Sequence, residues 1–152
     1  MRVSKSLIKD ITVDTTLERS QLTLDQLVEE ALEKAVDQKA LDPVVFSLSG
    51  TYNITERILI VSGTSVRHVK GIADKILSSL FNGKVHPTRV EGYATGEWII
   101  MDYSDLVIHI FFEPQRQYYA LDELLSKYPK VNFREELDTK IRRFKTGLHA
   151  LT

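Results

Sequence analysis

The chain contains no cysteine among its 152 residues. Disulfide bonds, thiol nucleophiles and zinc sites built on thiolates are therefore excluded. No apolar run approaches the roughly 20 residues that a membrane-spanning helix requires, and no apolar segment of a secretion signal follows the charged start. The formal net charge is only −1, which gives no overall attraction to nucleic acid or to an anionic membrane. We expect a cytoplasmic protein without a membrane partner, whose electrostatic recognition depends on a local patch.

The remaining composition is that of a globular protein. Hydrophobic residues make up 43% of the chain and charged residues 27%, and 152 residues are enough for one ordinary core but not for two. We predict one folded domain over residues 22–128. An N-terminal extension (1–21) precedes it, and a basic C-terminal extension (129–152) follows it.

Apolar periodicity predicts the elements of this domain. Helical spacing runs from Leu24 to about Lys39 and again from Val66 to about Phe81, where Asn82-Gly83 predicts a left-handed end. Short apolar runs predict strands over 44–48, 58–61, 85–90, 98–101 and 106–112, and a short helix is expected over 121–128. This order predicts an α/β fold, with a mixed sheet of about five strands and helices packed on its faces.

Two apolar runs stand at the centre of this pattern, Trp98 to Met101 and Leu106 to Phe112, separated by a short polar break. Their β-branched and aromatic residues predict an antiparallel pair of strands. Both runs are apolar at nearly every position, so we expect both strands to be covered on two faces. A loop with two glycines and two carboxylates, Glu91 to Glu97, leads into the pair and ends at the only tryptophan.

One turn, Gly63-Thr64-Ser65, lies between a predicted strand and a predicted helix, where backbone N–H groups can hold a phosphate. It lacks the second glycine and the lysine of a P-loop, and no paired acid for metal ions follows it. The histidines lack metal-binding spacing, and we expect His109 to be a hydrogen-bonded core residue. The sequence thus gives no positive sign of catalysis, metal or cofactor. A nucleotide-binding or nucleotidyltransferase-like enzyme that uses the Gly63 turn is the alternative.

Several blocks, in the same order, resemble the ribosomal silencing factor family, RsfS or Iojap. The matching residues are Val61-Ser62-Gly63-Thr64-Ser65, Arg67-His68-Val69, Ile72-Ala73-Asp74, Arg89-Val90-Glu91-Gly92, Gly96-Glu97-Trp98, Asp102-Tyr103, Val107, His109, Phe112, Arg116, Tyr118-Tyr119 and Leu121. The resemblance implies a sandwich similar to that of nucleotidyltransferases and a translation repressor without enzymatic activity or cofactor. It further implies binding to the large ribosomal subunit through ribosomal protein L-fourteen, which would sterically prevent joining of the small subunit when nutrients are short.

The resemblance places the docking site around the loop that precedes the tryptophan. The expected partner-binding residues are Glu91, Gly92, Tyr93, Gly96, Glu97, Trp98, Asp102 and Tyr118. Trp98 directly follows a polar loop, which favours an exposed anchor over a core residue, whereas Ile99, Ile100 and Met101 are expected to fill the core. The three carboxylates would pair with basic residues of the partner. The two tyrosines are expected at the rim, or else held by packing or through their hydroxyls.

The C-terminal extension, 129–152, is richer in Lys and Arg than in Asp and Glu, and its apolar spacing over 135–148 allows a final amphipathic helix. Such a segment would contact ribosomal RNA phosphates, an interaction that salt weakens steeply. The alternative is a solvated helix face with ordinary ion pairs. The resemblance also raises the prospect of a homodimer, because members of the family are often dimers.

Overall fold

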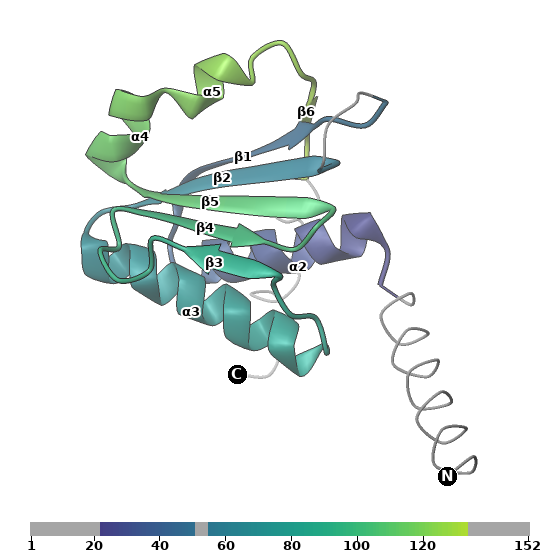
Figure 1. Cartoon of the computed structure of the whole chain (residues 1–152), viewed down its shortest axis with the longest axis horizontal. Helices are drawn as coiled ribbons and strands as arrows, with labels where there is room; N and C mark the ends of the chain where they lie inside the picture. Colours follow the sequence, from purple (N-terminus) through teal and green to yellow (C-terminus); the bar gives the residue numbers. More distant parts are fainter. Residues whose placement is uncertain (1–21, 51–54, 134–152) are drawn as a thin grey trace, which may run out of the picture.

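The structure, a computed structural model, describes residues 22–50 and 55–133 (Figure 1). Within this part of the chain the sheet has six strands in the order β3-β4-β5-β2-β1-β6. The elements are α2 (Leu24–Asp37), β1 (Leu41–Ser47), β2 (Arg57–Gly63), α3 (Val66–Asn82), β3 (Arg89–Glu91), β4 (Trp98–Asp102), β5 (Leu106–Phe112), α4 (Glu113–Tyr119), α5 (Leu121–Leu124) and β6 (Lys130–Val131). The predicted α/β fold is confirmed, with six strands where about five were expected.

The sheet is mixed because β2 and β5 run parallel, with Ile60 opposite His109, while its other neighbouring pairs are antiparallel. The predicted antiparallel pairing of the two central runs is confirmed, since Trp98 of β4 lies opposite Phe111 of β5. The strand that the sequence did not predict is β6, which has two residues and only one apolar side chain. A run that short gives no periodic signal.

Local hydrogen bonds fix where the two long helices begin. In the capping box of α2, the Thr23 hydroxyl accepts from the N–H of Gln26 at 3.1 Å, and the Thr23 N–H donates to the Gln26 side chain at 3.0 Å. Ser65 caps α3 by accepting from the N–H of His68 at 3.0 Å.

The predicted left-handed end of α3 is displaced by one residue. The residue with positive φ is Lys84 (64°), whereas Gly83 has φ −82°. The N–H of Val85 donates to the carbonyl of Leu80 at 2.8 Å, as in a Schellman motif. In this motif the left-handed residue directly precedes the donor, which places it at Lys84.

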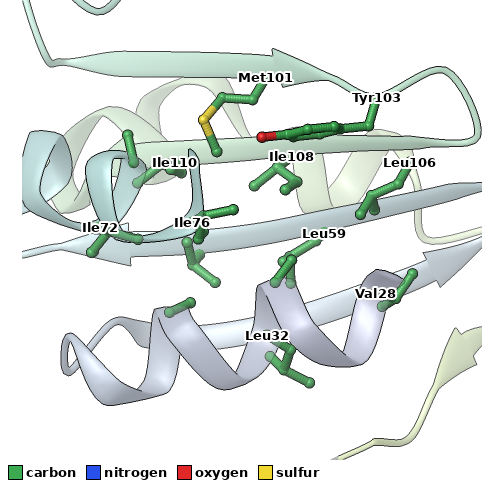
Figure 2. Close-up of a cluster of buried hydrophobic side chains, with 14 of the residues drawn as sticks. Val28, Leu32, Leu59, Ile72, Ile76, Met101, Tyr103, Leu106, Ile108 and Ile110 are labelled. Atoms are coloured by element: carbon green, nitrogen blue, oxygen red, sulfur yellow. The ribbon is translucent and has the colours of Figure 1, made fainter. Parts of the chain in front are cut away.

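Helices α2 and α3 lie together on one face of the sheet (Figure 1) and bury the main core against it. Figure 2 shows this cluster between the helices and the strands. The side chains labelled there come from α2 (Val28, Leu32), from α3 (Ile72, Ile76), and from the strands and the turn after β4 (Leu59, Met101, Tyr103, Leu106, Ile108, Ile110). All of them are buried, so this face supplies most of the hydrophobic stabilisation.

A smaller apolar cluster lies on the opposite face. Phe46, Ile60 and Phe111 are fully buried there, against Leu125 and the half-buried Leu121. Helix α4, which the sequence did not predict, begins directly after β5 and has a proline in its first turn. Because α4 contributes no buried residue of its own, it lacks the apolar stripe by which a helix is recognised in a sequence.

The sheet continues beyond residue 128, where the sequence pattern placed the end of the domain. Strand β6 pairs with β1 through Val131 opposite Val45, and Phe133 is only 9% exposed in the main core. The packed part of the chain therefore extends at least to Phe133. The extension 1–21 and the helix expected over 135–148 lie outside the described residues. In 22–50 and 55–133, no helix combines the length and the apolar character needed to cross a bilayer.

Candidate functional site

The face of the sheet opposite α2 and α3 is incompletely covered along β4. Ile99 and Met101 point into the main core and are fully buried, whereas Trp98, Ile100 and Asp102 on the other side are only half-buried. The expectation that this strand is covered on two faces is therefore wrong. So is the expectation that Ile100 fills the core.

Strand β5 continues the same half-open surface. His109 lies opposite Ile100, and Val107, two residues earlier, lies on the same side; both are half-buried. On the other flank, Glu91 of the edge strand β3 also lies opposite Ile100. We call the surface formed by these residues and the tryptophan the outer face, with the members Glu91, Trp98, Ile100, Val107 and His109. Partly exposed apolar side chains gathered on one surface are typical of an interaction site.

Trp98 is the most extensively contacted aromatic of the outer face. Its ring stacks on Phe111 at a centroid distance of 4.8 Å, and Tyr119 of α4 packs against it at 4.7 Å. Its indole N–H donates to Nδ1 of His109 at 3.0 Å. Trp98 is thus neither the exposed anchor that was expected nor a core residue, but a half-buried side chain held on three sides.

The hydrogen bond from Trp98 determines the protonation of His109. An indole N–H can only donate, so Nδ1 of His109 carries a lone pair and the ring proton lies on Nε2. Burial lowers the pKa of His109 from 6.5 to about 4, which keeps the ring neutral near pH 7. The predicted hydrogen bonding of this histidine is confirmed, but the residue lies in the outer face and not in the core.

The carboxylates at the edge of the outer face already have a partner within the chain. Arg89 Nε lies 3.2 Å from Oε1 of Glu91, and its NH2 atom lies 3.8 Å from Oδ2 of Asp102. The other oxygen of Asp102 accepts from the N–H of Ser104 at 2.8 Å. Glu97 is exposed. Two of the three acids expected to pair with a basic partner are therefore partly neutralised by the chain itself.

The two glycines of the loop before Trp98 are needed for close packing. Gly92 has φ +78°, and a Cβ placed there would lie 1.9 Å from the carbonyl oxygen of Trp98. Gly96 has φ +71°, and its Cβ would lie 2.6 Å from a side-chain carbon of Val66 in α3. Both positions demand glycine because of this approach and the left-handed backbone. They shape the site without offering side chains to a partner.

The same loop is fastened to α3 by polar contacts. The Tyr93 hydroxyl donates to Asp74 at 2.8 Å, and this hydrogen bond raises the pKa of Tyr93. Lys70 donates to the carbonyl of Ala94 at 3.0 Å. The hydroxyl of Tyr93 is bonded as one of the alternatives had it, while the ring remains 39% exposed and its position at the rim of a docking site stays a prediction. Tyr93 therefore anchors the loop on the helix side of the sheet.

Helix α4 is positioned by Arg116, whose side chain is 12% exposed. Its guanidinium donates to both carboxylate oxygens of Asp122, at 3.0 and 2.8 Å, and these contacts lower the pKa of Asp122. It also donates to the carbonyl of Asp42 at 2.7 Å and to the Ser62 hydroxyl at 3.0 Å. Because it joins α4 to β1 and β2, Arg116 fixes the helix that packs a tyrosine on Trp98.

Tyr118 is the most exposed large hydrophobic residue of the described chain, with 79% of its surface accessible. Its ring packs edge to face against Tyr119 at 5.1 Å, and Tyr119 is itself 48% exposed. The prediction of a rim position for Tyr118 thus agrees with its exposure. Together the two tyrosines extend the outer face beyond Trp98.

The turn after β2 uses its own polar groups internally. The N–H of Thr64 donates to Nδ1 of His68 at 2.9 Å, and the N–H of His68 is bonded by the Ser65 cap. A Cβ at Gly63 would lie 2.9 Å from Val69. Over 22–50 and 55–133, no three acidic or histidine side chains gather as a metal site. The geometry thus adds no support to the nucleotide-binding alternative.

The family profile described as "Ribosomal silencing factor during starvation" matches residues 21–149. The chain belongs to this family. It is similar to the ribosomal silencing factor RsfS of Halalkalibacterium halodurans, with 30% identity over 70% of this chain and 91% of that protein. A crystal structure of a protein from Chromobacterium violaceum superposes with a TM-score of 0.67 at 27% identity, covering 69% of this chain and 88% of the other. A mouse protein named "Mitochondrial assembly of ribosomal large subunit protein 1" is 26% identical over 57% of this chain and 40% of that protein.

Membership of the silencing factor family confirms the resemblance found in the sequence, and the matched residues include the whole outer face. Glu91, Trp98 and Asp102, which the sequence analysis assigned to the docking site, lie on the same side of the sheet, and their contact with a partner stays a prediction. Sequence reasoning missed the apolar members of the outer face, Ile100 and Val107. Their sequence signal was present but was attributed to burial on both faces of the sheet.

Proposed function

We propose that this chain docks on the large ribosomal subunit through the outer face, with ribosomal protein L-fourteen as its direct contact. Occupation of that surface sterically prevents the small subunit from joining and so lowers translation when nutrients are short. Membership of the silencing factor family supports the proposal. The name of the mouse relative, which refers to assembly of the large ribosomal subunit, supports the choice of subunit.

The observation that carries the proposal is the half-open apolar strip on β4 and β5. Trp98, Ile100 and Val107 keep part of their surface accessible, although α2 and α3 bury the opposite face of the same strands completely. Protein interfaces place apolar and aromatic residues at the centre and polar residues at the rim. The outer face has this arrangement, with Arg89 and Glu91 at its edge.

The mechanism requires occupancy and no chemical step. Contacts with the partner place the chain on the joining surface, and its volume then excludes the second subunit. The affinity for the large subunit therefore determines the strength of repression. On this proposal the loop 91–97 and helix α4 serve to hold the outer face in shape before docking, which reduces the entropy lost on binding.

Two further contacts belong to the proposal. A homodimer would use the short edge strand β3, where Val90 is 37% exposed and its neighbours are charged. Dimerisation there would lie beside the outer face and compete with docking. The contact of the basic extension with ribosomal RNA concerns residues outside the described part of the chain.

A binding experiment with charged substitutions tests the docking surface. Ile100→Glu places a carboxylate at the centre of the outer face and should abolish co-sedimentation with purified large subunits. Phe81→Glu is the matched control, because Phe81 is 61% exposed on α3, on the other side of the sheet. It should bind and block subunit joining like the unchanged protein. Equal binding by folded Ile100→Glu and Phe81→Glu would show that docking uses another surface.

A further inference from the structure

The outer face holds one polar group whose role the packing of the chain does not explain. Nδ1 of His109 accepts from Trp98, but Nε2 makes no hydrogen bond to any residue of 22–50 or 55–133. Nε2 is also not among the buried polar atoms without a partner, which in the described chain are Arg57 Nε and the Tyr103 hydroxyl oxygen. The Nε2–H group therefore reaches the surface of the outer face.

The apolar surroundings of this Nε2–H group make it selective for a partner that offers a hydrogen-bond acceptor. Ile100 on β4 and Ile60 on β2 lie opposite His109 on its two sides, so the ring sits in an apolar row of the sheet. When a partner covers this row, water is displaced and the N–H must find an acceptor or remain unpaired. A covered donor without an acceptor weakens binding, whereas a well-placed oxygen strengthens it.

We propose that His109 is a recognition residue of the outer face, donating its Nε2–H to an oxygen of the docked protein, with Trp98 as the positioning residue that keeps the proton there. This inference rests on the proposed docking function. The oxygen belongs to a backbone carbonyl or to a side-chain amide, hydroxyl or carboxylate of the partner. A lysine or arginine cannot take this place, because neither has an acceptor atom.

The proposal gives the Trp98 indole a second role beyond contact area. In the free imidazole the proton can occupy either nitrogen, and the donor on Nε2 would be lost if the proton moved to Nδ1. The 3.0 Å hydrogen bond from Trp98 excludes that tautomer. The lowered pKa of about 4 agrees with this geometry, since the ring then presents a donor without a positive charge.

Two substitutions of the histidine separate the donor from the acceptor. His109→Asn keeps an oxygen near Nδ1 for the Trp98 indole but lacks a group that reaches the place of Nε2. His109→Gln reaches that place with an amide N–H. We expect His109→Asn to weaken binding to purified large subunits about tenfold or more, and His109→Gln to recover most of this loss. His86→Asn, at an exposed histidine that packs on Phe81, is the matched control and should bind normally.

The tautomer provides a readout that a purely structural role would not move. Long-range ¹H–¹⁵N spectra of the full chain should show His109 protonated on Nε2 at pH 7. In Trp98→Phe, which keeps an aromatic ring but removes the indole N–H, a mixture of tautomers should appear. Trp98→Phe should weaken binding less in the His109→Asn background than in the otherwise unchanged chain. The reason is that the indole N–H affects binding through the histidine.

Two results would overturn the inference. One is a spectrum of the unchanged protein with the proton on Nδ1, which needs no variant to fold. The other is a folded His109→Asn protein that binds like the unchanged chain while Ile100→Glu does not bind. That second pattern would leave the docking proposal intact and remove only the role of His109. Failure of the unchanged protein to bind large subunits would instead refute the proposed function and this inference with it.

Discussion

The neutral histidine in the outer face makes the stability of the fold depend on pH in a defined window. Burial disfavours the charged ring and lowers the pKa of His109 to about 4 in the folded chain. In the unfolded chain the pKa has its ordinary value of 6.5. Below pH 6.5 the unfolded chain therefore binds a proton that the folded chain does not yet bind. The free energy of unfolding should fall as the pH decreases from 6.5 to about 4.

The size of this effect follows from the two pKa values. Each pH unit between them corresponds to about 1.4 kcal/mol, so the loss from His109 reaches at most about 2.5 kcal/mol at pH 4.5. Because Nε2 reaches the surface, where solvent weakens the effect, we expect His109 to lower the unfolding free energy by about 1–2.5 kcal/mol at pH 4.5. Asp122 also has a lowered pKa, through Arg116, but its contribution is lost only below its ordinary value of 3.8. The window above pH 4.5 thus isolates the histidine from this carboxylate.

The assay compares urea unfolding of the unchanged chain and of His109→Asn between pH 7.5 and 4.5. Far-ultraviolet circular dichroism is the appropriate probe, because protonation of His109 would itself alter the fluorescence of the adjacent Trp98. Groups elsewhere in the chain titrate in both proteins, so only the difference between the two curves reports on His109. The unchanged chain should lose about 1–2.5 kcal/mol more than the variant. Parallel curves, within about 0.5 kcal/mol of each other, would show that the ring is not buried as described.

Three further substitutions test the packing around the site by chemical unfolding. The hydroxyl of Tyr103 is buried without a hydrogen-bond partner among the described residues, so Tyr103→Phe should leave the unfolding free energy unchanged or raise it by up to about 1 kcal/mol. A decrease of more than about 1 kcal/mol would show that the hydroxyl has a partner. Gly92→Ala should lower the unfolding free energy by at least about 2 kcal/mol, because the new Cβ would meet the carbonyl of Trp98. Gly50 also has a positive φ but open space around it, so Gly50→Ala should lower the unfolding free energy by only about 1 kcal/mol, and equal losses would contradict the close approach. Arg116→Met should lower it by about 1–3 kcal/mol and also weaken subunit binding, since α4 loses its attachment; unchanged binding would separate α4 from the site.

The elements with local, periodic signals were predictable from the sequence. Helices α2 and α3 each have one apolar stripe and a side-chain cap, and both lie close to where the pattern placed them. The antiparallel pair β4 and β5 was equally clear, because two apolar runs flank a four-residue polar break. In these segments the information that fixes the structure lies within a few residues along the chain.

The elements that depend on distant contacts were not predictable in the same way. Helix α4 buries no side chain of its own and is held by Arg116, whose partner Asp42 lies 74 residues away in the sequence. Strand β6 has two residues and is fixed only by pairing with β1. Neither leaves a periodic pattern, so tertiary contacts decide both.

The same limitation explains the main error about the site. An apolar residue at every position of a strand predicts burial on both faces only if some element covers each face. On one side β4 is covered by α3, but on the other side α4 reaches only as far as Trp98 and leaves Ile100 half-buried. The continuous apolar run is equally what a strand needs if its second cover is another protein. A sequence pattern does not distinguish these two cases.

The outer face that results is less charged than the sequence suggested. Arg89 lies between Glu91 and Asp102, so two of the carboxylates expected to attract a basic partner are compensated before any docking. Exposed ion pairs of this kind contribute little free energy, and rim charges mainly change the rate of association. The centre of the face offers the apolar surface of Ile100 and Val107, the Trp98 ring and one neutral donor on His109. On the docking proposal, apolar contact and hydrogen bonding therefore supply more of the affinity of this surface for its partner than net charge does.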